Sequence, residues 1–248
     1  TYTFAQMQAA VGAIAFQSDS QAMLVGDASG TLTLFDKDGT VIREFAAQPS
    51  AVTTLAVSPD GTQAISGGAD GAVYVWDVAT GTLNATLSGH QQAVSSIAYS
   101  PDGRYAMSGD KSAVLILWDA ATNTVLHTLT GLGTFSSSIT FSPDSSRVLT
   151  GFDNGSMILW DVEAGTALRT FVDHTASVTS IVYAEDGLSA SSVSVDGSMV
   201  TQRVDSLPEI IAWLNSNYSI RELSCQERVT YDVLPACDTS TLALTPTP

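Results

Sequence analysis

Apolar and polar residues alternate along short stretches of this chain, and turn-forming residues separate the stretches. Residues 72–76, Ala-Val-Tyr-Val-Trp, are one example. Alternation with a period of two is typical of a β-strand with one buried face. The turn Ser58-Pro59-Asp60-Gly61 has counterparts at 100–103, 142–145 and 184–187. Since Pro presets φ and Gly accepts positive φ, the pattern predicts a chain built from short β-hairpins.

The hairpins belong to a tandem repeat, in which an aromatic residue followed by Asp recurs every 41 or 42 residues. The four pairs are Phe35-Asp36, Trp76-Asp77, Trp118-Asp119 and Trp160-Asp161. This period and its Trp-Asp ending resemble the WD-repeat family of β-propellers, in which each repeat forms one four-stranded blade. The resemblance implies an all-β fold, a β-propeller of about five blades with a short helical extension after it.

Aligning the repeats on these pairs divides the chain into a propeller domain, residues 1–204, a helical tail, 205–238, and a flexible Thr/Pro-rich end, 239–248. The predicted blades are residues 11–46, 52–88, 93–130, 135–172 and 177–204. The fifth repeat lacks a fourth strand, and residues 1–6, with Tyr2-Thr3-Phe4, are a candidate to supply it and close the ring. WD propellers most often have seven blades, so a closed five-bladed ring and an open fragment of a longer propeller are both retained as interpretations.

The family resemblance also implies a role for the buried polar residues. In WD repeats a His before the first strand, a Ser or Thr in the second, an Asp in the following turn and the Trp of the third form a structural hydrogen-bonded tetrad. The matching residues are Ser66, Asp70 and Trp76; His90, Ser108 and Trp118; Thr150 and Trp160; and His174, Ser192 and Asp196. No repeat matches all four positions, since Gln48 replaces His in the second repeat and Ser112 replaces Asp in the third. We therefore expect packing between blades to dominate stability.

Charge narrows the range of partners. The chain has 9 Lys and Arg against 25 Asp and Glu, a formal net charge of −16. Nucleic acid is bound by neutralising phosphates with Lys and Arg, so no nucleic-acid partner is expected, and anionic membrane surfaces are disfavoured for the same reason. No apolar run approaches the roughly 18 to 20 residues of a membrane-spanning helix, so no membrane insertion is expected.

Signatures of catalysis are missing from the sequence. It has no Gly-x-Ser-x-Gly elbow, no phosphate-binding loop and no His-Glu-x-x-His zinc motif, and its three histidines lie in separate repeats. We predict a protein that is not an enzyme, with no catalytic residue, cofactor or metal.

The tail has features of its own. Ser206-Leu207-Pro208-Glu209 is a capping box, and apolar residues follow it at helical spacing. Residues 221–228 and 235–238 resemble tails that follow WD repeats in bacterial multi-repeat proteins. They contain Cys225 and Cys237, either a disulfide or two free thiols. A disulfide predicts an extracellular or periplasmic location, and free thiols predict a cytoplasmic one.

The family resemblance favours a non-catalytic scaffold or adaptor that binds proteins, including copies of itself, through the loop faces of the propeller. The expected partner face is Gln91, Gln92, Lys111, Phe152 and Asp153. Two interpretations of Phe152 are retained: it is the aromatic anchor of this face, or it packs under the neighbouring loop. Two alternatives are a building block of an extracellular assembly and a ligand-sensing domain of a larger receptor. The second is less favoured, because only Ser, Thr and Ala are available to line a central channel.

Overall fold

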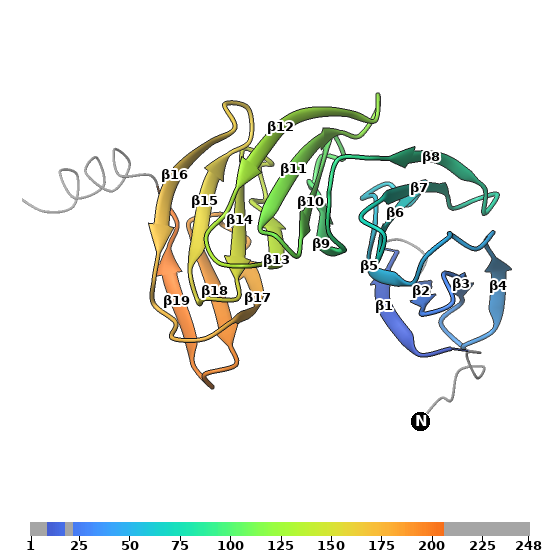
Figure 1. Cartoon of the computed structure of the whole chain (residues 1–248), viewed down its shortest axis with the longest axis horizontal. Helices are drawn as coiled ribbons and strands as arrows, with labels where there is room; N and C mark the ends of the chain where they lie inside the picture. Colours follow the sequence, from blue (N-terminus) through green and yellow to red (C-terminus); the bar gives the residue numbers. More distant parts are fainter. Residues whose placement is uncertain (1–8, 18–21, 206–248) are drawn as a thin grey trace, which may run out of the picture. The chain divides into compact units, whose positions relative to one another are not determined.

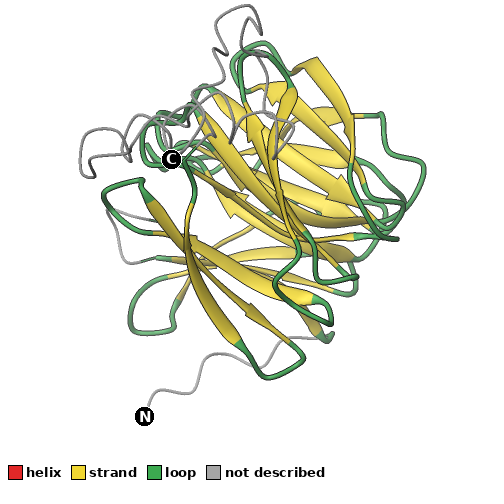
Figure 2. Ribbon diagram, turned by 90° about the vertical axis from the view of Figure 1, so that its left-hand side faces the viewer, coloured by secondary structure: helices red, strands yellow, loops and turns green. Residues whose placement is uncertain are grey.

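The computed structural model describes residues 9–17 and 22–205, which contain strands and loops and no helix (Figures 1 and 2). The strands of the first two sheets are β1 (Val11–Phe16), β2 (Met23–Asp27), β3 (Leu32–Phe35), β4 (Val41–Glu44), β5 (Val52–Val57), β6 (Gln63–Gly68), β7 (Val73–Asp77) and β8 (Leu83–Leu87). Those of the next two are β9 (Val94–Tyr99), β10 (Tyr105–Asp110), β11 (Val114–Asp119), β12 (Thr124–Thr130), β13 (Ser136–Phe141), β14 (Arg147–Phe152), β15 (Met157–Asp161) and β16 (Thr166–Phe171). The fifth sheet contains β17 (Val178–Tyr183), β18 (Ser189–Ser194) and β19 (Met199–Arg203).

Each sheet is an antiparallel meander of strands that follow one another in the chain. Four sheets have four strands, and the fifth has three in its described part. The predicted all-β propeller fold is confirmed, and we call the sheets blades 1 to 5 in chain order. The expected pairing of residues 1–6 with blade 5 lies outside the described residues.

The hairpins close where the sequence places residues that accept a left-handed backbone. Gly61, Gly103 and Gly187 have φ of 70°, 72° and 68° in the turns between first and second strands. Asn123 has φ of 58° in a turn between third and fourth strands. Asn tolerates this conformation better than most residues with a side chain, so the turn forms without Gly.

The first strands of the blades pack against one another in the order β1, β5, β9, β13, β17. Among the described strands, β1 and β17 have no comparable contact. Hydroxyls of these strands join neighbouring blades: Thr53 Oγ1 donates to Val94 O at 2.6 Å, and Ser95 Oγ donates to Ser136 O at 2.6 Å. These hydroxyls, which the sequence offers as channel-lining groups, are engaged in contacts between blades.

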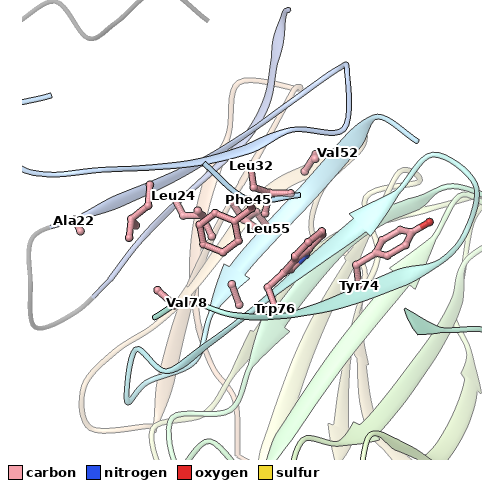
Figure 3. Packing of buried hydrophobic residues seen from close by; sticks show 11 residues of the cluster. Ala22, Leu24, Leu32, Phe45, Val52, Leu55, Tyr74, Trp76 and Val78 are labelled. Atoms are coloured by element: carbon pink, nitrogen blue, oxygen red, sulfur yellow. The ribbon is translucent and has the colours of Figure 1, made fainter. Parts of the chain in front are cut away.

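The core lies between blades. Trp76 of blade 2 is buried against Leu24, Leu32 and Phe45 of blade 1 (Figure 3). The rings of Phe45 and Trp76 meet edge to face, with centroids 6.1 Å apart. Trp118 and Trp160 are likewise buried in the clusters that join blade 3 to blade 2 and blade 4 to blade 3. The repeated Trp therefore packs its own blade onto the preceding one.

The predicted tail helix, Cys225 and Cys237 lie outside the described residues, so the disulfide and the location of the protein stay predictions. In the part of the chain that the structure describes, no helix meets the length and apolarity needed to cross a membrane.

Candidate protein interaction face

Blade 3 contains a buried network that joins two loops to the core. His90 Nε2 lies 2.7 Å from Ser108 Oγ, and Trp118 Nε1 donates to the same oxygen at 2.8 Å. Asp110 Oδ2 lies 3.2 Å from His90 Nδ1. A carboxylate at Nδ1 favours the tautomer with its proton there, so Nε2 is left to accept the Ser108 hydroxyl. All four side chains are buried, and they fix the loop that carries His90.

The identity of the acidic member corrects the sequence analysis. We expected no complete tetrad, because Ser112 stands at the usual Asp position of this repeat. The carboxylate comes instead from Asp110, the last residue of β10. Ser112 donates two hydrogen bonds to Asp110 Oδ1, from N at 2.8 Å and from Oγ at 2.7 Å. The sequence signal was present, since an Asp ends an otherwise apolar and small-residue strand.

Burial and hydrogen bonding set the charges of this network. Desolvation lowers the pKa of His90, and the neighbouring Asp110 only partly opposes it. For Asp110, burial raises the pKa, but the hydrogen bonds from Ser112 and Val114 N outweigh burial and hold it below its ordinary value. The network thus combines a carboxylate with an imidazole that resists protonation.

Blade 2 builds an equivalent network without His. Ser66 Oγ donates to Gln48 Oε1 at 2.7 Å and accepts from Trp76 Nε1 at 2.8 Å. Asp70 takes a different partner, accepting from the Tyr74 hydroxyl at 2.6 Å. Burial is the larger cause and the hydrogen bond to Asp70 the second, and together they raise the pKa of Tyr74 to about 12.

The last two blades keep parts of the arrangement. In blade 4, Trp160 Nε1 donates to Thr150 Oγ1 at 2.8 Å. In blade 5, His174 Nε2 lies 2.8 Å from Ser192 Oγ. Asp196 is 3.7 Å from His174 Nδ1, and hydrogen bonds from Ser198 and the Thr175 amide hold its pKa well below the usual range. The two predicted histidines therefore both contact the predicted serines of their own blades.

The Asp110, His90 and Ser108 side chains have the order of a hydrolytic triad, but the surroundings of Ser108 differ from those of a nucleophile. Its hydroxyl oxygen is fully buried and already accepts from Trp118. A nucleophile must reach its substrate, and a triad needs oxyanion donors beside it. Among the described residues, no group of three or more His, Cys, Asp and Glu is placed to hold a metal ion.

The networks support one face, which we call the loop face. It consists of the turns between second and third strands (28–31, 69–72, 111–113, 153–156 and 195–198) and the loops into first strands (45–51, 88–93, 131–135 and 172–177). The turns of blades 1 to 4 lie against the loop that enters the next blade. A Cβ on Gly71 would be 2.9 Å from Gln92 O, and one on Gly155 would be 2.4 Å from His174 O. Their φ values of 85° and 84° also favour glycine, so the loop face is held rigidly.

Three predicted partner residues form one exposed group on this face. Gln91 and Gln92 are exposed in the loop before β9, and Lys111 is exposed in the turn after β10. Lys111 N donates to Ala93 O at 3.0 Å, which joins the two segments. We call Gln91, Gln92 and Lys111 the loop patch.

The expected anchor, Phe152, is not on the surface. The structure buries it completely as the last residue of β14. Its ring occupies the space beside Gly131, where an added Cβ would be 2.0 Å from Phe152 Cε1. The interpretation of Phe152 as an exposed anchor was wrong, and the alternative, packing under the neighbouring loop, is the one the structure shows, because Gly131 leaves space for the ring.

Asp153 is half-buried and supports its own loop. Its carboxylate accepts from Thr134 N at 2.7 Å, from Thr134 Oγ1 and from Phe135 N at 3.3 Å. Burial raises the pKa of Asp153, and these hydrogen bonds outweigh burial and lower it. The carboxylate is therefore occupied within the chain.

Repeated antiparallel meanders that pack side by side through their first strands define a β-propeller of WD-like repeats. The family model described as "Vps8 beta-propeller" matches residues 5–130 and 133–218. Because these segments make up most of the sequence, the chain belongs to the Vps8 beta-propeller family. A comparison with curated proteins gave no significant match.

Proposed function

We propose that this protein is a non-catalytic scaffold that binds another protein through its loop face, with the loop patch as the contact. Its fold class supports the general kind of function, since β-propellers typically serve as protein interaction domains. The observation that carries the proposal is the exposure of Gln91, Gln92 and Lys111 on loops fixed by buried networks. Within the described ranges, these three side chains make no hydrogen bond or ion pair with the rest of the chain.

Rigid support matters for such a contact. Binding costs the entropy of every loop and side chain that becomes ordered. The backbone on both sides of the patch is already held by the His90 network and by the bond from Lys111 N to Ala93 O. A partner would therefore order only three side chains. Its complementary surface would present acceptors for the Lys111 ammonium and mixed donors and acceptors for the two amides.

The charge of the whole chain favours the same class of partner. A net charge of −16 opposes polyanions such as nucleic acid and anionic membrane surfaces. Lys111 is one of only two lysines, and the other, Lys37, lies 3.0 Å from Asp38 in an exposed ion pair. A neutral protein surface with a hydrogen-bond acceptor for Lys111 is the partner that fits.

Cross-linking mass spectrometry on the native source tests the proposal. A carboxylate-reactive reagent suits this chain, because acidic residues are many and lysines few. We expect links from exposed loop-face acids, such as Asp173, to another protein. Links confined to copies of this chain would contradict the scaffold proposal and favour a building block of an assembly.

Substitution then identifies the surface. The combined change of Gln91→Ala, Gln92→Ala and Lys111→Glu should remove those links and weaken binding of the identified partner tenfold or more, about 1.4 kcal/mol or above. Lys37→Glu is the matched control, since it makes the same charge change outside the loop face. Equal binding by both variants would place the contact elsewhere.

A further inference from the structure

Blade 4 carries the one Asn-Gly sequence of the chain, Asn154-Gly155, in its turn on the loop face. The Asn154 side chain is exposed to solvent. Its carbonyl oxygen accepts from Ser156 N at 3.0 Å and from Ser156 Oγ at 2.6 Å. A backbone N–H can only donate, so the atom that faces Ser156 is Oδ1 and not the amide nitrogen. Ser156 thus aims two donors at the side-chain carbonyl of an exposed asparagine.

This arrangement suits deamidation, the loss of the side-chain amide. The Gly155 backbone nitrogen attacks Cγ of Asn154 and closes a ring, its proton passes through solvent to Nδ2, and Nδ2 leaves as ammonia. Water then opens the ring at either of its two carbonyls, which gives aspartate or isoaspartate. Negative charge develops on Oδ1 during the attack, and donors already aimed at that oxygen stabilise it. Gly155 has no Cβ to hinder the approach of its nitrogen.

The glycine sets Asn154 apart from the other described asparagines, Asn84 and Asn123, which both precede a residue with a side chain. One contact opposes the attack, since Gly155 N donates to Phe152 O. Its length of 3.2 Å lies at the long end of the usual range. The nitrogen gives up this proton when it attacks, so the reaction is fastest at alkaline pH.

The product fits the turn, because blade 5 already has aspartate in the equivalent place. Asp196 Oδ1 accepts from Ser198 N and Ser198 Oγ, as Asn154 Oδ1 does from the two donors of Ser156. An aspartate at position 154 therefore keeps both hydrogen bonds. It also places a new carboxylate on the exposed loop face, and the net charge of the chain changes from −16 to −17.

We propose that Asn154 is a deamidation site, activated by Ser156, through which the loop face gains a negative charge after folding. The modification is covalent and needs only water as its co-reactant. It goes beyond the scaffold role and does not depend on it, because Asn154, Gly155 and Ser156 define the site by themselves. The folded protein becomes a mixture of two charge forms as it ages.

Peptide mass spectrometry of the full chain, incubated at mildly alkaline pH, measures the reaction as a gain of about 1 Da at position 154. Each protein is incubated folded and in concentrated urea, where the sequence is the same and the turn is absent. Ser156→Ala removes the Oγ donor and keeps the Asn-Gly sequence. Ser29→Ala is the matched control, because Ser29 N and Oγ donate to Asp27 Oδ1 in the same way in blade 1.

The proposal predicts that the folded wild type loses the amide faster than the same chain in urea. Folded Ser156→Ala should react about tenfold more slowly than the folded wild type, folded Ser29→Ala at the wild-type rate, and all three equally in urea. Equal rates for the folded wild type and Ser156→Ala would overturn the role of Ser156. Circular dichroism checks folding. If Ser156→Ala does not fold, the wild type decides alone, and a rate no faster when folded than in urea overturns the proposal.

Discussion

A Cβ on Gly67 would lie 2.7 Å from Val94 Cγ1, so blade 2 and blade 3 approach each other as closely as the side chain of Val94 allows. Gly67→Val should therefore destabilise the protein by about 2–3 kcal/mol, because the added methyl groups overpack a filled interface. Chemical denaturation of the variant and the wild type measures this difference in the free energy of unfolding.

Val193→Gly is the control for that substitution. The position is equivalent in β18 but faces no described blade, so the change should cost no more than about 1 kcal/mol, from the backbone entropy of glycine. Similar losses in both variants would mean that strand propensity, and not packing between blades, governs the position.

Ser108→Ala removes the acceptor of Trp118 Nε1 and the partner of His90 Nε2 at once. Two buried polar groups lose their partner, and we expect a loss of about 2–3 kcal/mol in the free energy of unfolding. Ser192→Ala, which leaves His174 Nε2 without its partner but involves no Trp, should cost less, about 1 kcal/mol. An equal effect would show that the indole contributes nothing to the network.

Trp118→Ala should cost about 3–5 kcal/mol, since the ring fills the interface between blades 2 and 3. Trp118→Phe should retain much of that stability, because Phe35 occupies the same position in β3 and is buried there. Thermal melting compares the two variants with the wild type. An unchanged midpoint for Trp118→Ala would contradict the role assigned to packing between blades.

The lowered pKa of His90 predicts a loss of stability in mild acid. Below its ordinary pKa of 6.5 the unfolded chain binds a proton at His90 that the folded chain does not. The contribution of neutral His90 to the free energy of unfolding is therefore complete above pH 6.5. It falls as the pH drops toward the lower pKa of the folded state, by at most about 1.4 kcal/mol per pH unit.

His90→Gln isolates this effect, because Gln48 shows that glutamine fits the same position in blade 2. The difference in unfolding free energy between wild type and variant should shrink as pH falls from 7 toward 5. A difference that is constant with pH would show that the folded protein protonates His90 as readily as the unfolded chain.

The strands and their turns were predictable because their signals are local. Alternation, Pro-Asp-Gly turns and the Trp-Asp pairs each act over a few residues, and Gly39 and Gly81 have the positive φ that their turns require. The contacts of Ser108 with His90 and Trp118 were also predicted, since the family pattern fixes their spacing.

Contacts between loops were harder to predict. Phe152 was open to two interpretations because it precedes a turn, and only its neighbour Gly131, twenty-one residues earlier in the sequence, shows why it is buried. Asp110 lies two residues before the position at which the family pattern has Asp, and only its distance of 3.2 Å from His90 Nδ1 identifies it as the acidic member. The sequence shows that blade 5 has Val193 where the other blades have glycine, at Gly26, Gly67, Gly109 and Gly151. Only the structure shows why glycine is needed there, because the next blade approaches that position closely.

Thiol labelling tests most directly the claim that the first strands of blades 2 to 5 are covered by the preceding blade, while the first strand of blade 1 is exposed. In a chain with Cys225→Ser and Cys237→Ser, single cysteines replace Ile14, its equivalent Leu55 in β5 or the exposed Val195. Ile14→Cys should react at a rate close to that of Val195→Cys. Leu55→Cys should react at least about 100-fold more slowly than Val195→Cys, because the reagent reaches its thiol only when the structure opens locally. Equal protection at positions 14 and 55 would contradict the account.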